Sequence, residues 1–172
     1  DLPPREWAEY KETGDLDELL DRCLEDVKSR GMLLHAPPGC GKTTFSNRIC
    51  EILEKAGVPV VRTAPTHCAA RQMMQPASTL HRYAYSAFSR GRCPRITGVL
   101  VVDEFFACSM LLHTLLNALV TCTGVRVLVI RDANQFAAVS STWRGVYVSP
   151  QEVLRSAYMH RLCGGVSIEL SH

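Results

Sequence analysis

Apolar and polar positions along the chain of 172 residues fall into two alternating kinds of segment. Short, nearly continuous apolar runs are typical of strands buried on both faces, whereas apolar residues repeating every three or four positions predict amphipathic helices. The apolar runs predict strands at 31–35, 58–63, 98–102, 125–130 and 165–170. The other segments predict helices at 15–30, 42–56, 105–121 and 150–158, helix or loop over 67–90, a turn at 140–142 and irregular structure over 1–14.

This alternation predicts an α/β fold, in which a mostly parallel sheet is flanked by helices and joined by right-handed crossovers. The chain is long enough for one domain with a substantial core. We expect an acidic N-terminal segment and helix at 1–30 to pack on this core, and residues 31–172 to form a nucleotide-binding domain.

A glycine-rich segment follows the first of these strands and leads into a helix. Residues 36–43 read Ala-Pro-Pro-Gly-Cys-Gly-Lys-Thr, which matches a phosphate-binding loop except at Ala36, where the pattern has glycine. The glycines let successive backbone N–H groups point into one hollow, the lysine adds charge for the outer phosphates, and the threonine hydroxyl can bind Mg²⁺. The expected phosphate contacts are Pro38, Gly39, Cys40, Gly41, Lys42, Thr43 and Thr44.

Two adjacent carboxylates follow the apolar run at 98–102. Asp103 and Glu104 then stand at the carboxyl end of a buried strand, where open α/β sheets bind ligands. Such a pair can divide the work, with Asp103 binding Mg²⁺ and Glu104 deprotonating an attacking water. Acidic residues also often simply end a strand, but the upstream phosphate loop favours the catalytic interpretation.

Charge is distributed unevenly, although the formal net charge is only +2. Residues 1–30 hold ten acidic and five basic residues, whereas no acidic residue occurs between Glu54 and Asp103. A basic stripe interleaved with aromatic residues suits single-stranded nucleic acid, but charge alone fits a solvated basic face with core aromatics equally well. The stripe consists of Lys55, Arg62, Arg71, Arg82, Arg90, Arg92 and Arg95 with His67 and His81, and its aromatics are Tyr83, Tyr85 and Phe88.

Cysteine spacing and hydropathy argue against two other classes of protein. The eight cysteines include no Cys-x-x-Cys pair, so we expect free thiols rather than structural zinc. Cys40 lies at a helix N-terminus, where thiols are often reactive, and we expect bound nucleotide to shield it. No apolar run is long enough for a membrane span, and we expect a reducing, intracellular location in the cytoplasm or nucleus. Because the chain begins at Asp1 without a methionine, we expect it to be part of a longer protein.

Five segments in order resemble motifs of superfamily 1 helicases, most closely the branch that holds the RecD-like and PIF-like DNA helicases. They are the phosphate loop at 36–44, Thr-Ala-Pro-Thr-His-Cys-Ala-Ala at 63–70, Ala-Ser-Thr-Leu-His-Arg at 77–82, the Asp-Glu pair at 103–104, and the strand ending Arg-Asp-Ala-Asn-Gln at 131–135. The resemblance implies a RecA-like P-loop NTPase fold. It also implies that the strand before Gln135 lies between the phosphate-loop strand and the Asp103 strand.

The resemblance further implies roles for particular residues. Lys42, Glu104 and Gln135 would be catalytic, with Gln135 near the γ-phosphate, and Thr43 and Asp103 would hold Mg²⁺ beside ATP. The chain would be the first motor domain of a replication-type helicase that moves along a single strand, with DNA favoured over RNA, and unwinds duplexes. It would need a second RecA-like domain of the same parent chain, so we expect it to be weakly active or inactive alone. The implied single-strand contacts are Pro65, Thr66, His67, Thr79, His81 and Arg82.

Three other functions remain open at this stage. RNA helicase domains of viral replication proteins share several of these motifs. A kinase or another P-loop NTPase would share the phosphate loop but has no reason to carry the segment at 63–82. A non-catalytic module is favoured by Arg131, which stands where the family has glycine, but the intact Lys42, Thr43, Asp103 and Glu104 argue against it.

Overall fold

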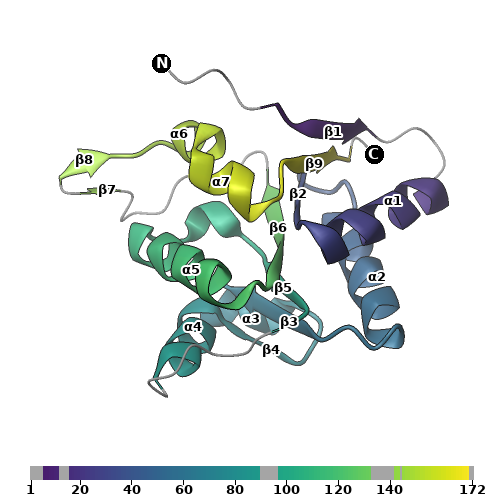
Figure 1. Cartoon of the computed structure of the whole chain (residues 1–172), viewed down its shortest axis with the longest axis horizontal. Coiled ribbons are helices and arrows are strands. Elements are labelled where there is room, and N and C mark those ends of the chain that lie inside the picture. Colours follow the sequence, from purple (N-terminus) through teal and green to yellow (C-terminus); the bar gives the residue numbers. More distant parts are fainter. Residues whose placement is uncertain (1–5, 12–15, 90–96, 133–141, 144, 171–172) are drawn as a thin grey trace.

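The computed structural model describes residues 6–11, 16–89, 97–132, 142–143 and 145–170. Strands and helices alternate along most of the chain, as the sequence pattern predicts (Figure 1). The elements are β1 (Ala8–Lys11), α1 (Leu16–Ser29), β2 (Met32–Ala36), α2 (Lys42–Lys55), β3 (Val60–Ala64), α3 (His67–Gln72), β4 (Ala77–Thr79), α4 (Leu80–Phe88), β5 (Val99–Val102), the 3-10 helix η1 (Phe105–Ala107), α5 (Met110–Thr123), β6 (Arg126–Asp132), β7 (Thr142–Trp143), β8 (Val146–Tyr147), α6 (Pro150–Arg155), α7 (Ala157–Leu162) and β9 (Val166–Glu169).

The main sheet has seven strands in the order β1-β9-β2-β6-β5-β3-β4, and every pair in it is parallel. The predicted position of β6 between β2 and β5 is confirmed. The register pairs Ala36 at the end of β2 with Asp132 at the end of β6. The carboxyl ends of the central strands therefore meet at one edge of the sheet, where open α/β sheets bind ligands.

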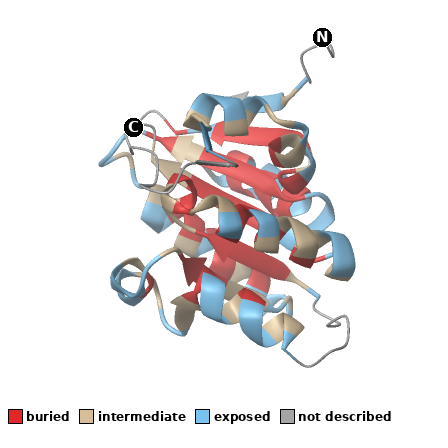
Figure 2. Cartoon of the chain, turned by 90° about the vertical axis from the view of Figure 1, so that its left-hand side faces the viewer, coloured by how far each residue is buried: buried red, intermediate tan, exposed pale blue. Residues whose placement is uncertain are grey.

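Two apolar cores lie on opposite faces of the sheet, because successive side chains of a strand point to opposite sides. In β2, Met32 and Leu34 join the first core, beneath α1 and α2, while Leu33 joins the second core, beneath α4, α5 and α7. Strands β5 and β6 divide their residues in the same way. Figure 2 shows the result as buried strands between helices whose outer faces are exposed. The fold is therefore the predicted layered α/β architecture.

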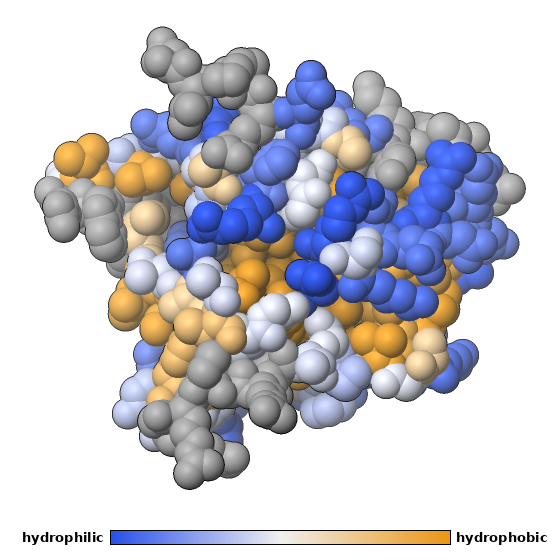
Figure 3. All heavy atoms as spheres, in the orientation of Figure 1, coloured by the Kyte–Doolittle hydropathy of each residue, from blue (hydrophilic) through white to orange (hydrophobic). Residues whose placement is uncertain are grey.

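Helix α1 covers the first core with one face and meets solvent with the other. Its buried side chains Leu20, Cys23 and Val27 recur at helical spacing. The opposite face is strongly hydrophilic, as the blue surface on the right of Figure 3 shows. Among the described segments, none of the helices has the length and apolar character needed to cross a bilayer.

The structure differs from the prediction at one edge of the sheet. Residues 1–14 are predicted to be irregular, but Ala8–Lys11 form β1 and pair in parallel with β9. The N–H of Ala8 donates to the carbonyl of Gly165 at 2.8 Å, and the Trp7 ring packs edge-on against His160. The prediction of irregular structure is wrong for these residues, because so short a strand shows too few alternations to be recognised in the sequence.

Two predicted helices are interrupted by serine. The segment at 105–121 is η1 followed by α5, and Ser109 between them accepts the N–H of Leu112 as an N-cap. The segment at 150–158 divides into α6 and α7 at Ser156, which caps α7 through the N–H of Met159. Serine hydroxyls compete for backbone donors and therefore favour helix starts over helix interiors.

Two short pairings lie outside the predicted strands. Strand β4 extends the sheet beyond β3 within the stretch predicted as helix or loop. Strands β7 and β8 form a small antiparallel hairpin that projects at the left of Figure 1. The turn predicted at 140–142 falls mostly outside the described residues, and Thr142 belongs to β7.

Candidate nucleotide-binding site

The predicted phosphate loop connects the end of β2 to the start of α2. Gly39 and Gly41 have φ angles of 83° and 71°, in the left-handed region that glycine adopts without cost. A Cβ atom added at either glycine would meet nothing within 4 Å, so both glycines border open space. The N-terminus of the fourteen-residue helix α2 borders the same space and favours an anion there. This arrangement suits a phosphate chain.

The Lys42 side chain reaches back over the loop toward β6. Its Nζ atom donates to the carbonyls of Ala36 and Pro37 at 3.2 and 3.3 Å, and pairs with Oδ2 of Asp132 at 3.2 Å. Both side chains of the ion pair are largely buried, at 14% and 19% exposed. The lysine charge therefore stands at the mouth of the loop, held by a carboxylate from the neighbouring strand.

Asp103 and Glu104 follow β5 directly, as predicted. The N–H of Asp103 donates to the carbonyl of Thr63 at 2.9 Å, so the pairing of β5 with β3 continues up to this residue. Oδ1 of Asp103 accepts the N–H of Glu104 at 2.8 Å. Glu104 has φ 48° and ψ 40°, a left-handed conformation that is unusual for a residue with a side chain. The backbone thus turns sharply at the point where the two carboxylates emerge.

Burial shapes the acidity of both carboxyl groups. Loss of solvent raises the pKa of Asp103, while its hydrogen bond from the Glu104 N–H and the charge of Lys42 act in the opposite direction. Loss of solvent also raises the pKa of Glu104, and the neighbouring charge of Asp103 raises it further. A carboxylate with a raised pKa is a stronger base, which suits proton abstraction from water.

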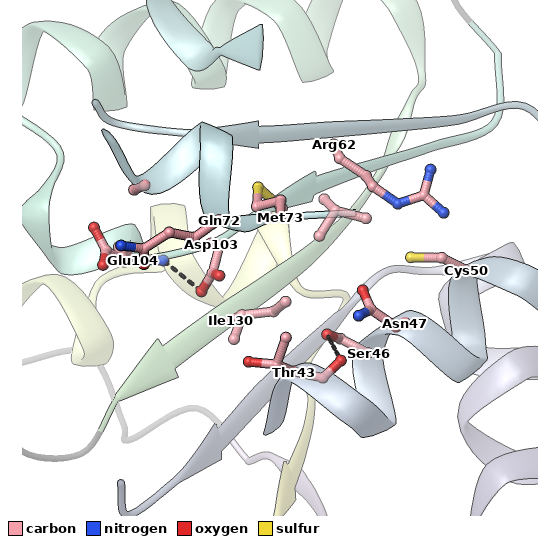
Figure 4. A pocket seen from close by; sticks show the side chains of 12 residues that line it. Thr43, Ser46, Asn47, Cys50, Arg62, Gln72, Met73, Asp103, Glu104 and Ile130 are labelled. Atoms are coloured by element: carbon pink, nitrogen blue, oxygen red, sulfur yellow. Dashed lines mark hydrogen bonds between the residues drawn. The ribbon is translucent and has the colours of Figure 1, made fainter. Parts of the chain in front are cut away.

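One pocket of about 80 Å³ brings these groups together. Figure 4 shows Asp103 and Glu104 at one end, with Arg62 and Cys50 at the other. The pocket also contains Thr43, whose hydroxyl oxygen and the Asp103 carboxylate are the kinds of ligand that Mg²⁺ prefers. Among the described residues, no group of three or more His, Cys, Asp or Glu could hold a metal ion. Few protein ligands are expected for Mg²⁺, which keeps several waters and binds substrate phosphates.

Several residues of the site have no role in the sequence analysis, among them Asp132, Asn47 and Gln72. Asp132 could have been suspected, because it follows an apolar strand within the Arg-Asp-Ala-Asn-Gln segment. Asn47 and Gln72 line the pocket from α2 and α3, and nothing in the local sequence distinguishes them from surface amides. Gln135, predicted to lie near the γ-phosphate, falls outside the described residues, so its position stays a prediction.

Cys40, like Cys23, Cys50 and Cys68, is a free thiol. Cys40 is half-buried in the loop and packs against the first core, whereas Cys68 and Cys122 are exposed. Burial raises the pKa of Cys50 to about 11, so this thiol at the inner end of the pocket stays protonated.

The residues predicted to contact a single strand gather around α3 and the start of α4. Thr66 caps α3 by accepting the N–H of Ala69 at 3.1 Å, and Thr79 caps α4 by accepting the N–H of Arg82 at 3.2 Å. His67, Thr79 and Arg82 help to line a hollow of about 180 Å³, which we call the cationic hollow. Its remaining lining residues are Ala70, Arg71, Gln75, Ala77 and Ser78.

The other two predicted contacts border this region. Pro65 is half-buried just before the Thr66 cap, and His81 is exposed on α4. The structure thus clusters the six predicted residues. Thr79, however, is 6% exposed and uses its hydroxyl as a cap.

Arg62 does not belong to the surface stripe in which the sequence analysis places it. Only 2% of Arg62 is exposed, and its guanidinium pairs with both carboxylate oxygens of Glu54 at 2.7 and 2.9 Å. Strand β3 directs this side chain under α2, where the ion pair ties the sheet to the helix. The prediction for Arg62 is therefore wrong, because its place in an alternating strand, not its charge, decides where it points.

Comparison with known proteins gives consistent matches. The sequence model of a family described as "AAA domain" matches residues 22–141. The ATP-dependent RecD2 DNA helicase of Deinococcus radiodurans is 32% identical over 122 residues, covering 65% of this chain and 17% of that protein. The chain therefore spans less than a fifth of the length of this relative.

Solved structures of helicases share the fold. The Pif1 helicase from Candida albicans has a TM-score of 0.66 at 17% identity, covering 94% of this chain and 39% of that one. Pif1 from Bacteroides sp, in complex with ADP-AlF4, has a TM-score of 0.59 at 18% identity, covering 93% of this chain and 42% of that one. Together with the RecD2 match, these similarities confirm the resemblance to the RecD- and PIF-like branch that the five segments predict.

Proposed function

The chain belongs to the AAA domain family, and from this premise we propose that it is the ATP-hydrolysing motor domain of a helicase that moves along single-stranded nucleic acid, with DNA favoured. The observation that carries the proposal is the meeting of Thr43, Asp103 and Glu104 in one pocket beside the phosphate loop. The names of the relatives, an ATP-dependent DNA helicase and Pif1 helicases, support this activity.

The geometry supports a division of roles in ATP hydrolysis. The open loop and the N-terminus of α2 would bind the phosphates, and Thr43 and Asp103 would hold Mg²⁺. When bound, Mg²⁺ would neutralise phosphate charge and orient the terminal group. Lys42 lies beside the loop and would exchange its bond to Asp132 for one to a phosphate oxygen.

Glu104 is the proposed general base. Its carboxylate lies in the same pocket as Thr43, and burial and the Asp103 charge raise its pKa. It would therefore accept a proton from the attacking water. Gln135 would help to position that water, a role that rests on the resemblance.

Nucleic acid and a second motor domain complete the proposal. We assign single-strand contact to Pro65, Thr66, His67, Thr79, His81 and Arg82, supported by their clustering around the cationic hollow. Because the chain matches only 17% of the RecD2 helicase, we propose that a second RecA-like domain of the parent protein completes the nucleotide site.

The decisive experiment measures the ATPase rate of the parent protein with and without single-stranded DNA or RNA. We expect DNA to stimulate the rate many-fold, and Lys42→Ala or Glu104→Gln to abolish the stimulated rate. Stimulation by RNA but not by DNA would reassign the substrate. A rate that neither polymer changes would contradict the motor function and favour another P-loop NTPase.

A further inference from the structure

Only part of the acid-free stretch between Glu54 and Asp103 is available to a ligand. Of its three interleaved aromatics, Tyr83 and Phe88 pack against the second core, and burial raises the pKa of Tyr83. Tyr85 differs, because 67% of it is exposed. The structure thus separates one surface aromatic from two that stabilise the fold.

Tyr85 and His81 form a pair of nearly parallel rings. The two rings lie one helical turn apart on α4, with centroids 6.2 Å apart and planes inclined by 11°. Residues four apart face the same side of a helix, so both rings project from one strip of α4. Leu80 and Ala84, which directly precede the two ring residues in the chain, are fully buried and anchor the helix. The position of the ring pair is therefore fixed by packing.

The ring pair adjoins the cationic hollow. Arg82, which lines the hollow, lies three residues before Tyr85 and so occupies the neighbouring strip of α4. The hollow also presents His67 and Arg71. Among the ion pairs of the described residues, none engages Arg71 or Arg82. Arginines that no carboxylate of the described residues engages thus stand beside an exposed aromatic pair.

We propose that the His81–Tyr85 pair is a stacking platform for a base of single-stranded nucleic acid whose phosphates occupy the cationic hollow. An exposed aromatic ring accepts any base, because every base has a π-face, while the arginines bind the backbone. The inference rests on the proposed function and adds Tyr85 to the strand-binding surface. A protein partner would also cover an exposed tyrosine, but the neighbouring arginines, which pair with no carboxylate in the described part of the chain, favour a polyanion.

The test separates stacking from charge by binding measurements on the parent protein. The probes are oligo(dT) and an abasic oligonucleotide of the same length, each titrated over a range of salt concentrations. The variants are Tyr85→Ala, Tyr85→Phe and Arg71→Ala. Tyr147→Ala is the matched control, because Tyr147 is also an exposed tyrosine, at 59%, but lies on the β7–β8 hairpin.

We expect Tyr85→Ala to weaken oligo(dT) binding about tenfold, to leave abasic binding unchanged, and to keep the slope of log Kd against log salt. Tyr85→Phe keeps the ring and should bind like the unmodified protein. Arg71→Ala should weaken binding of both probes and lower the salt slope by about one. The Tyr147 control should change neither probe.

Several results on the Tyr85 variants would overturn the platform. They are unchanged oligo(dT) binding by Tyr85→Ala, an equal loss on both probes, and failure of Tyr85→Phe to restore binding. If the unmodified parent protein binds neither probe, the nucleic-acid part of the proposed function fails together with the platform. Loss of oligo(dT) binding in Tyr147→Ala would move the stacking site to the hairpin and also contradict the proposal.

Discussion

The pocket and the cationic hollow lie on the two sides of α3 and differ in whether their cationic side chains form ion pairs. In and beside the pocket, two cationic groups pair with carboxylates: Lys42 pairs with Asp132, and Arg62 pairs with Glu54. On the hollow side, no described ion pair engages Arg71 or Arg82. Paired and desolvated groups suit a small ligand held in one geometry, whereas solvated cations suit a polymer that is bound with strong salt dependence.

The largest expected effect is on the pocket side. Glu104→Gln removes the proposed base and should lower kcat of the parent ATPase by about 10²–10⁴, since general base catalysis contributes this much. Nucleotide affinity should change little, because the amide keeps the shape of the side chain. Arg71→Ala, on the other side of α3, should instead weaken strand binding and spare the unstimulated rate. Equal effects of the two variants on the unstimulated rate would contradict the assignment of hydrolysis to the pocket and of strand binding to the hollow.

The second effect concerns folding. Glu54→Ala leaves the buried Arg62 without its partner and should lower the free energy of unfolding by about 3 kcal/mol. Arg71→Ala removes an exposed arginine and should change it by less than about 0.5 kcal/mol. Urea unfolding followed by circular dichroism measures both. If Glu54→Ala and Arg71→Ala lowered the free energy of unfolding by similar amounts, the buried ion pair of Arg62 would not contribute more to stability than an exposed arginine does.

A smaller effect is expected in thiol reactivity. Cys40 in the phosphate loop should be alkylated several-fold more slowly when Mg-ATP is present, because the nucleotide would cover it. Cys68 is exposed on α3 and lines neither the pocket nor the hollow, so its rate should not change. Mass spectrometry of iodoacetamide-treated protein reports both sites in one sample. An unchanged Cys40 rate at saturating nucleotide would argue against binding at this loop.

The smallest effect is a shift in titration. Burial and the Asp103 charge raise the pKa of Glu104, so in nucleotide-free protein it should lose its proton at higher pH than an ordinary glutamate. Asp103→Asn removes a neighbouring negative charge, which favours ionisation of Glu104 and should lower its pKa. Carbon-detected NMR of the carboxyl groups measures this. A Glu104 pKa that is insensitive to Asp103→Asn would mean that burial alone sets it.

Sequence reasoning succeeds where chemistry depends on residues close together in the chain. The phosphate loop and the Asp103–Glu104 pair are local patterns, and the place of β6 between β2 and β5 follows from the family resemblance. It fails where the outcome depends on packing between distant segments. The partner of Lys42 lies 90 residues away, and the burial of Arg62 depends on which face of β3 meets α2. The exposure of Tyr85, near the half-buried Tyr83, likewise follows from how α4 docks on the second core.

The left-handed backbone at Glu104 has a consequence for stability. Of the described residues, it is the non-glycine with a positive φ angle, and such a conformation costs on the order of 1–3 kcal/mol. Asparagine tolerates this region better, so Glu104→Asn should raise the melting temperature while removing the proposed base. The melting temperature is thus expected to be lower than it could be, because the proposed chemistry needs a carboxylate at this position.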